Sequence, residues 1–250
     1  MKYLKFKRAV LVAALISSLC FDASAQLSEY PEWFLFPREF PEGQIGVSFG
    51  NKTTRQDAEI VFTAYKNCIV DGVLRILSTE DITFPHRQSD YFYYYSENSL
   101  NEIAGRFVAV DSMVTNLIKS QSIAIFQLDS GKFEVRKRIK TSQLNKPDWI
   151  NKTVYKDGEY FYAVGAYTSR GNENDSWKTA EERAIFSILL HLNADIKSET
   201  IIDNTGHSSD EYKKVIEFKV KQALREITVL ERYPDATEKI NYVFLRLKAE

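Results

Sequence analysis

The chain has 250 residues, of which 44% are hydrophobic, 27% charged and 13% aromatic, and its formal net charge at pH 7 is −1. This composition is typical of folded globular proteins and excludes disordered, collagenous and multi-span membrane proteins. The balanced charge gives no reason to expect a nucleic-acid partner.

The first 25 residues have the pattern of a secretory signal peptide. Basic residues precede an apolar run at positions 9–15, and Ala23-Ser24-Ala25 forms an A-x-A cleavage site. The run is about half of what is needed to cross a bilayer roughly 30 Å thick. We therefore expect an exported protein whose mature chain begins at Gln26. Cys20 allows the alternative of a lipoprotein, although Leu19 stands where that processing requires a small residue. Membrane association would require this lipidation.

The rest of the chain contains an internal repeat. Pro31-Glu32-Trp33 recurs as Pro147-Asp148-Trp149, and each copy is followed by an apolar strand that contains one glycine, at 45–49 and 164–167. A helix is expected after each strand. The first begins at Thr54 and carries apolar residues at helical spacing as far as Ile76, and the second covers 179–192. The apolar residues of this second helix lie on more than one side, which predicts two packing partners.

Each half then continues in the same order. A strand is expected at 90–95 or 199–203, followed by a helix that opens at Ser99-x-x-Glu102 or Ser208-x-x-Glu211. A terminal hairpin joins 108–110 to 123–128 in one half and 227–230 to 242–247 in the other. The expected class is α+β, with two similar βαβαββ units of antiparallel or mixed sheets covered by helices. The expected divisions are a signal peptide at 1–25, repeats at 26–131 and 147–250, and a linker at 132–146.

These motifs, a P-x-W element, an apolar strand with V-G, an alanine-containing helix and a closing strand pair, resemble the twenty-kilodalton surface lipoprotein family of Gram-negative bacteria. They also resemble the related N-terminal domain of the flagellar T-type ring protein. The resemblance implies an envelope or periplasmic α+β protein without enzymatic activity, with an adhesive or assembly role and with envelope proteins as partners. Two copies in one chain depart from the simple lipoproteins.

A search for reactive groups predicts no enzyme, no cofactor and no metal site. The three histidines, His86, His191 and His207, have no partner at zinc-ligand spacing. Cys68, the only cysteine of the expected mature chain, lies on an apolar stripe and is interpreted as a buried hydrophobic residue. No nucleophile, phosphate-binding or dinucleotide motif is present.

One aromatic run has a functional interpretation. In a strand, Tyr91, Tyr93 and Tyr95 face one way, whereas Phe92 and Tyr94 face the other. We take Tyr91, Tyr93 and Tyr95 as candidate binding residues; the alternative is that this face packs on the helices. Two hypotheses follow: a non-catalytic interaction or assembly module of the cell envelope, or a protein that binds a small molecule or glycan in a cleft between the repeats.

Overall fold

The computed structural model describes residues 27–39, 45–50, 54–78, 86–116, 121–128, 137–169, 172–194, 200–202 and 214–250. The predicted signal peptide and Cys20 lie outside these residues. The α-helices within them are α2 (Glu32–Leu35), α3 (Arg55–Lys66), α4 (Glu97–Ile103) and α5 (Glu173–Ala194). Short 3-10 turns η1 (Pro37–Glu39), η2 (Thr141–Gln143) and η3 (Asp148–Asn151) lie in the connections.

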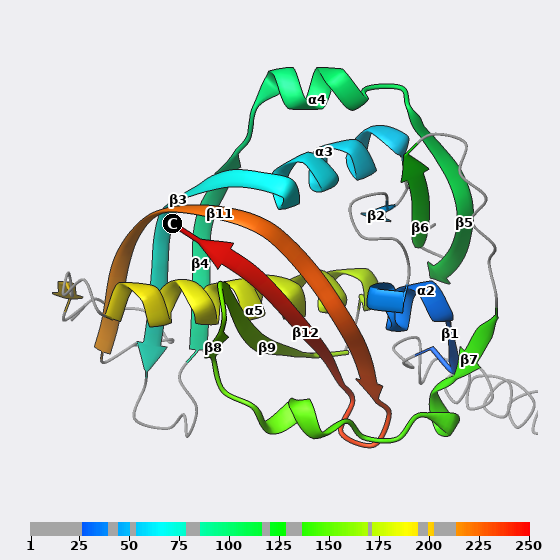
Figure 1. The fold of residues 1–250 in the computed structure, drawn as a ribbon. Coiled ribbons are helices and arrows are strands. Elements are labelled where there is room, and N and C mark those ends of the chain that lie inside the picture. Colours follow the sequence, from blue (N-terminus) through cyan, green and yellow to red (C-terminus); the bar gives the residue numbers. More distant parts are fainter. Residues whose placement is uncertain are drawn as a thin grey trace, which may run out of the picture.

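The strands form three antiparallel sheets (Figure 1). The largest has the order β4 (His86–Tyr94), β3 (Asn67–Ser78), β11 (Lys214–Asp235), β12 (Ile240–Ala249), β9 (Tyr160–Thr168) and β8 (Tyr155–Asp157), and β10 (Thr200–Ile202) also pairs with β11. A second sheet has the order β2 (Ile45–Gly50), β6 (Gln121–Leu128) and β5 (Phe107–Asn116). The third pairs β1 (Glu29–Pro31) with β7 (Arg138–Lys140). The α+β class is confirmed.

The long strand β11 connects two parts of the largest sheet. Its first part, Lys214 to Arg225, pairs with β3, and its second part, Leu224 to Asp235, pairs with β12. An irregularity of the register separates the two parts, and Glu226 within it has a φ of 51°. Such a bulge bends a strand and increases its twist. In Figure 1 the strand is accordingly an arch that spans the molecule.

One face of the largest sheet is covered by α5. Asn172 caps this helix, because its side-chain oxygen accepts hydrogen bonds from the backbone nitrogens of Asn174 and Asp175. Alternate residues of the strands pack against α5 in the main core, including Val220, Leu224, Leu245, Leu247 and Ala163. The helix also contacts β2, β5 and β6 of the second sheet. The predicted two packing partners of this helix are therefore confirmed.

The second core lies between the two larger sheets and is built around the segment before β2. Tyr30, Trp33 and Phe34 are fully buried there against Ile123 of β6 and Trp177 of α5. The Phe34 ring meets the Trp177 ring edge to face, with centroids 5.3 Å apart. Trp33 also donates a hydrogen bond of 2.8 Å from its indole nitrogen to the Asp111 carboxylate. The tryptophan of the first P-x-W element is therefore part of this core.

The two halves share a strand order but are not confirmed as two separate units. In the first half, β2 pairs with β6, which pairs with β5; in the second, β9 pairs with β12, which pairs with β11. In both halves the first strand leads into a helix and the last two strands form the predicted hairpin. However, β3 and β4 of the first half join the sheet of the second half through β11. One continuous sheet therefore crosses the predicted boundary at 132–146. Within this predicted linker, β7 pairs with β1 and η2 follows.

Three predicted helices differ in extent from the structure. The helix expected at 179–192 is α5, which begins earlier, at Glu173. The helix expected from Thr54 to Ile76 ends at Lys66, and the rest of that segment belongs to β3. Its apolar residues also fit a period of two, and pairing with the distant strand β11 decides between the two periods. The helix expected from Ser99 begins instead at Glu97 with Ser96 as its cap. Ser208 and Glu211 lie outside the described residues, but from Lys214 onward the chain is a strand instead of a helix.

Gly165 allows the close approach of β9 to α5. A Cβ atom at this position would lie 1.8 Å from the Ala180 carbonyl oxygen and 2.5 Å from the Ala184 nitrogen. Because both neighbours are backbone atoms of a helix, we expect Gly165→Ala to lower the free energy of unfolding by about 3 kcal/mol or more. Urea denaturation of the variant and the native protein measures this difference in the free energy of unfolding. Ala166→Ser, on the opposite face of β9, should cost less than about 1 kcal/mol. Equal stability of Gly165→Ala and the native protein would contradict this packing.

Candidate functional site

The predicted binding residues Tyr91 and Tyr93 lie on the face of β4 that packs inward, and Tyr95 directly follows this strand. All three are half-buried against the main core. The rings of Tyr91 and Tyr93 meet edge to face, with centroids 5.5 Å apart. Burial raises the pKa of both phenols above its ordinary value. These side chains are placed to stabilise the sheet, as the alternative interpretation expected.

The other face of the same strand is open. Phe92 and Tyr94 are 65% and 58% exposed, and Ile69, the partner of Tyr94 on β3, is 42% exposed. Among the described residues, neither aromatic ring has a stacking or cation contact. Gly72 lies opposite Tyr91 on β3, and a Cβ atom there would lie 2.4 Å from the Tyr91 Cα, so the two strands are closely apposed. The exposed side chains of Phe92, Tyr94 and Ile69 form a small apolar surface, which we call the β4 patch.

Among the described strands, none pairs with the outer side of β4, so the β4 patch lies at a sheet edge. Strand β4 is the last strand of the largest sheet and pairs with β3 over nine residues without a register shift. Proteins usually protect such edges with short strands, bulges, lysines or prolines. At the opposite edge, β8 has only three residues, and the edge strand β5 of the second sheet has two register shifts. Strand β4 has neither form of protection.

Charged residues accompany the β4 patch on the same face of the sheet. Asp90 follows Phe92 in the outward-facing row of β4, and its partner on β3 is Val73. Asp71 lies between Phe92 on β4 and Lys221 on β11. Asp90 and Lys221 are exposed, and the described residues offer neither of them an ion pair. The surface therefore combines free aromatic rings with unpaired charges.

The far end of the same face carries more tyrosines, but their rings are already in contact with other groups. The Tyr155 and Tyr162 rings stack with centroids 4.9 Å apart, and the Lys152 ammonium lies 5.5 Å from the Tyr155 centroid. Arg246 and Lys248 lie 4.5 and 4.8 Å from the Tyr160 ring. These contacts stabilise the surface internally and leave less ring area for a ligand than at the β4 patch.

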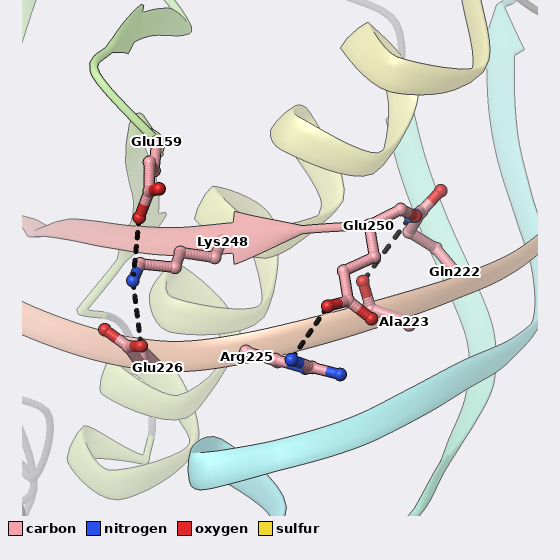
Figure 2. A network of polar contacts seen from close by, with 7 residues as sticks. All are labelled: Glu159, Gln222, Ala223, Arg225, Glu226, Lys248 and Glu250. Carbon is pink, nitrogen blue, oxygen red and sulfur yellow. Dashed lines mark hydrogen bonds and ion pairs between the residues drawn. The ribbon is translucent and has the colours of Figure 1, made fainter.

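An ion network lies between these two regions (Figure 2). Lys248 lies between the carboxylates of Glu159 and Glu226, at 3.1 and 3.0 Å. Arg225 pairs with Glu250 at 2.8 Å. The hydrogen bond from the Tyr160 hydroxyl lowers the pKa of Glu226. The network holds the last residues of β12 to the bulge of β11, and since its charges are mutually paired we interpret it as structural.

Two carboxylates are buried along α5. Glu181 accepts hydrogen bonds from Arg232 at 3.0 Å and from Tyr65. Glu173 accepts hydrogen bonds from Tyr30 and Asn241, and burial raises its pKa. Both groups lie in contact with the cores and connect separate elements. Their arrangement is that of structural polar networks.

The described residues hold no group of three or more histidine, cysteine or acidic side chains that could bind a metal ion. Cys68 is 2% exposed and lies on β3, and burial raises its pKa to about 12. A nucleophilic cysteine requires an accessible thiol with a lowered pKa. The interpretation of Cys68 as a buried hydrophobic residue is confirmed, although it lies on a strand and not on the predicted helix.

Comparisons with known proteins identify no relative: no family model, curated protein or solved structure matches the chain. Among the described helices, none is long and apolar enough to cross a membrane. Sequence reasoning missed Phe92 and Tyr94, because alternation predicts two aromatic faces without indicating which one packs inward. The available signal was on β3, where the polar Asp71 alternates with the apolar Val70 and Leu74. This alternation indicates that the face of the sheet with Asp71, and with its partner Phe92, is the one turned away from the core.

Cys68 should be unreactive in the folded protein. In a Cys20→Ser variant, which makes Cys68 the only thiol, we expect a disulfide reagent at pH 8 to leave the native protein unlabelled and to label it fully in denaturant. The physical reason is burial, which both blocks access and disfavours the thiolate. Mass spectrometry measures the labelled fraction. Rapid labelling of the native protein would show that Cys68 is accessible.

Glu173 should make stability depend on pH. Because its folded pKa is raised above the ordinary value of 4.5, its contribution to stability is greatest below that value and is lost as pH rises through the folded pKa. Glutamine resembles the neutral form and retains an oxygen for Tyr30 and Asn241. We therefore expect Glu173→Gln to raise the Tm more at pH 8 than at pH 4.

Glu181→Gln is the matched control. It removes the buried carboxylate that pairs with Arg232 at 3.0 Å and should lower stability at pH 8 by about 3 kcal/mol. Thermal unfolding at both pH values measures the two variants. A Glu173→Gln variant that is less stable than the native protein at pH 8 would contradict the cost that we assign to this buried carboxylate.

Proposed function

We propose that the chain is a non-catalytic interaction module of the cell envelope, which binds an extended segment of a partner polypeptide at the edge of β4. The segment adds a strand to the largest sheet, and its side chains contact the β4 patch. Backbone hydrogen bonds provide affinity in this mode of recognition, and alternate side chains provide specificity. The envelope location and the partnership with envelope proteins rest on the signal-peptide pattern and on the resemblance described above.

The observation that carries this proposal is the combination of a nine-residue edge without a register shift and two exposed aromatic rings on it. An edge strand presents unpaired N–H and C=O groups, which can pair with another strand. Cross-strand contacts with aromatic residues contribute roughly 0.2–1 kcal/mol each. In the part of the chain that the structure describes, the other exposed large aliphatic residues are Val108 and Val114 of β5, whose bulges interrupt the ladder.

The alternative of a glycan ligand would use the same rings. Phe92 and Tyr94 have free faces that a sugar could stack on. The predicted cleft residues Tyr91, Tyr93 and Tyr95 instead pack on the core, and Tyr155 and Tyr160 are covered by other groups. We favour the polypeptide because a sugar would leave the backbone groups of the edge unused.

The proposal is tested by selecting displayed seven-residue peptides against the protein. We expect enrichment of peptides with alternating apolar residues, with micromolar affinity by calorimetry. Phe92→Lys with Tyr94→Lys, which introduces edge-protecting lysines, should weaken these peptides at least tenfold. Val108→Lys with Val114→Lys on β5 is the matched control and should leave binding unchanged.

Two results would overturn the proposal. Selected peptides that bind the Phe92→Lys, Tyr94→Lys variant as well as the native protein would place the interaction elsewhere. Binding to an array of glycans that is lost in the same variant, with no peptide enriched, would replace the polypeptide by a sugar ligand.

A further inference from the structure

The β4 edge carries one exposed acidic side chain at a fixed distance from its aromatic residues. Along the outward-facing row, Tyr94, Phe92 and Asp90 succeed one another at intervals of two residues. Successive residues of such a row are about 6.8 Å apart along the strand. Asp90 has no ion pair within the part of the chain that the structure describes, and its neighbour on β3 is the apolar Val73. The edge therefore presents two apolar positions followed by one uncompensated negative charge.

A strand added to β4 would place one of its own side chains beside each of these three. In an antiparallel pair, directly opposite residues lie on the same face with Cβ atoms about 4.5–5.5 Å apart. At this distance a lysine or arginine opposite Asp90 can reach the carboxylate. An acidic residue there would meet a like charge, which is destabilising. Aromatic or β-branched residues are favoured opposite Tyr94 and Phe92.

The direction of the added strand follows from the sheet. All the pairs within the largest sheet are antiparallel, and antiparallel pairing is slightly more stable per residue than parallel pairing. The partner sequence then runs in the reverse order of β4. Its first contact residue lies opposite Tyr94, the residue two positions later lies opposite Phe92, and the residue four positions later lies opposite Asp90.

On the basis of the function proposed above, we infer that β4 selects an antiparallel partner segment of the form Φ-x-Φ-x-[Lys/Arg], where Φ is an aromatic or β-branched residue. Phe92 and Tyr94 contact the two Φ side chains. Asp90 fixes the register, because a shift by two residues would move the basic side chain to a position opposite Phe92 or Gln88, neither of which is acidic. A shift by one would turn it to the inward face, opposite Ser89 or Tyr91.

The test compares three synthetic peptides by calorimetry. The first is acetyl-Ser-Tyr-Thr-Tyr-Thr-Lys-Ser-amide, the second has glutamate in place of lysine, and the third has the first sequence reversed. We expect the lysine peptide to bind about fivefold more tightly than the glutamate peptide at low salt, and the difference to shrink at 0.5 M salt. The reversed peptide should bind more weakly than the first.

Variants then assign the preference to Asp90. Asp90→Lys should invert the preference between the lysine and glutamate peptides, and Asp90→Asn should remove it. Asp157→Lys changes the net charge equally at the opposite edge of the sheet, on β8, where Asp157 is exposed, and should keep the native preference. Circular dichroism checks that the variants are folded.

The outcomes separate this inference from the proposed function. Equal binding of the lysine and glutamate peptides, or the same preference after Asp90→Lys, would overturn the inference while leaving strand addition at β4 intact. Tighter binding of the reversed peptide would overturn the antiparallel direction. If none of the three peptides binds, and the selected peptides are also insensitive to Phe92→Lys and Tyr94→Lys, the proposed function itself fails.

Discussion

The buried guanidinium of Arg232 is the point on which the arrangement of the elements depends. It donates hydrogen bonds to the Phe34 carbonyl oxygen at 2.9 Å and to Glu181 at 3.0 Å, and it lies 4.5 Å from the centre of the Phe34 ring. Glu181 in turn accepts a hydrogen bond from Tyr65 of α3. A buried charge is tolerated only where its partners are held in position. The residue therefore fixes β11, α2, α5 and α3 relative to one another, and it holds the segment before β2 between the two larger sheets.

This arrangement makes the two faces of the largest sheet unequal. Because α5 and the segment around Phe34 occupy the inner face, the inward-facing apolar residues of the strands pack against them. The outer face is covered in part by η3, whose Trp149 ring stacks on that of Phe244 with centroids 5.4 Å apart, and elsewhere it is stabilised by its own side chains. At the end formed by β8, β9 and β12 this is achieved by stacked rings and by the paired charges around Lys248. At the β4 end the side chains remain exposed, so the two ends of one surface have different physical character.

The parts of the fold that local patterns determine were predicted from the sequence: the start of α3 at Thr54, the helix α5, the terminal hairpins and the α+β class. The parts that depend on distant partners were not. Residues 67–78 fit both helical and strand periods, and the pairing of β3 with β11 selects the strand. Likewise, the alternation of β4 predicts two aromatic faces, but the core packed against Tyr91 and Tyr93 decides that Phe92 and Tyr94 are the exposed pair. Burial of Arg232 has no local signal, since Phe34 and Glu181, which it contacts, come from two distant elements, α2 and α5.

Asp90 also gives a physical reason why the open edge of β4 does not favour self-association of the chain. If two copies paired in antiparallel fashion about Phe92, each Asp90 would lie opposite Tyr94 of the other copy and would lack a counter-charge. If they paired about Asp90, two carboxylates would lie directly opposite each other, which is destabilising. Neither arrangement satisfies both the aromatic and the acidic positions, whereas a different segment with a complementary charge can satisfy all three. A single acidic residue thus disfavours pairing of the chain with itself and leaves the edge available for a partner of the right sequence.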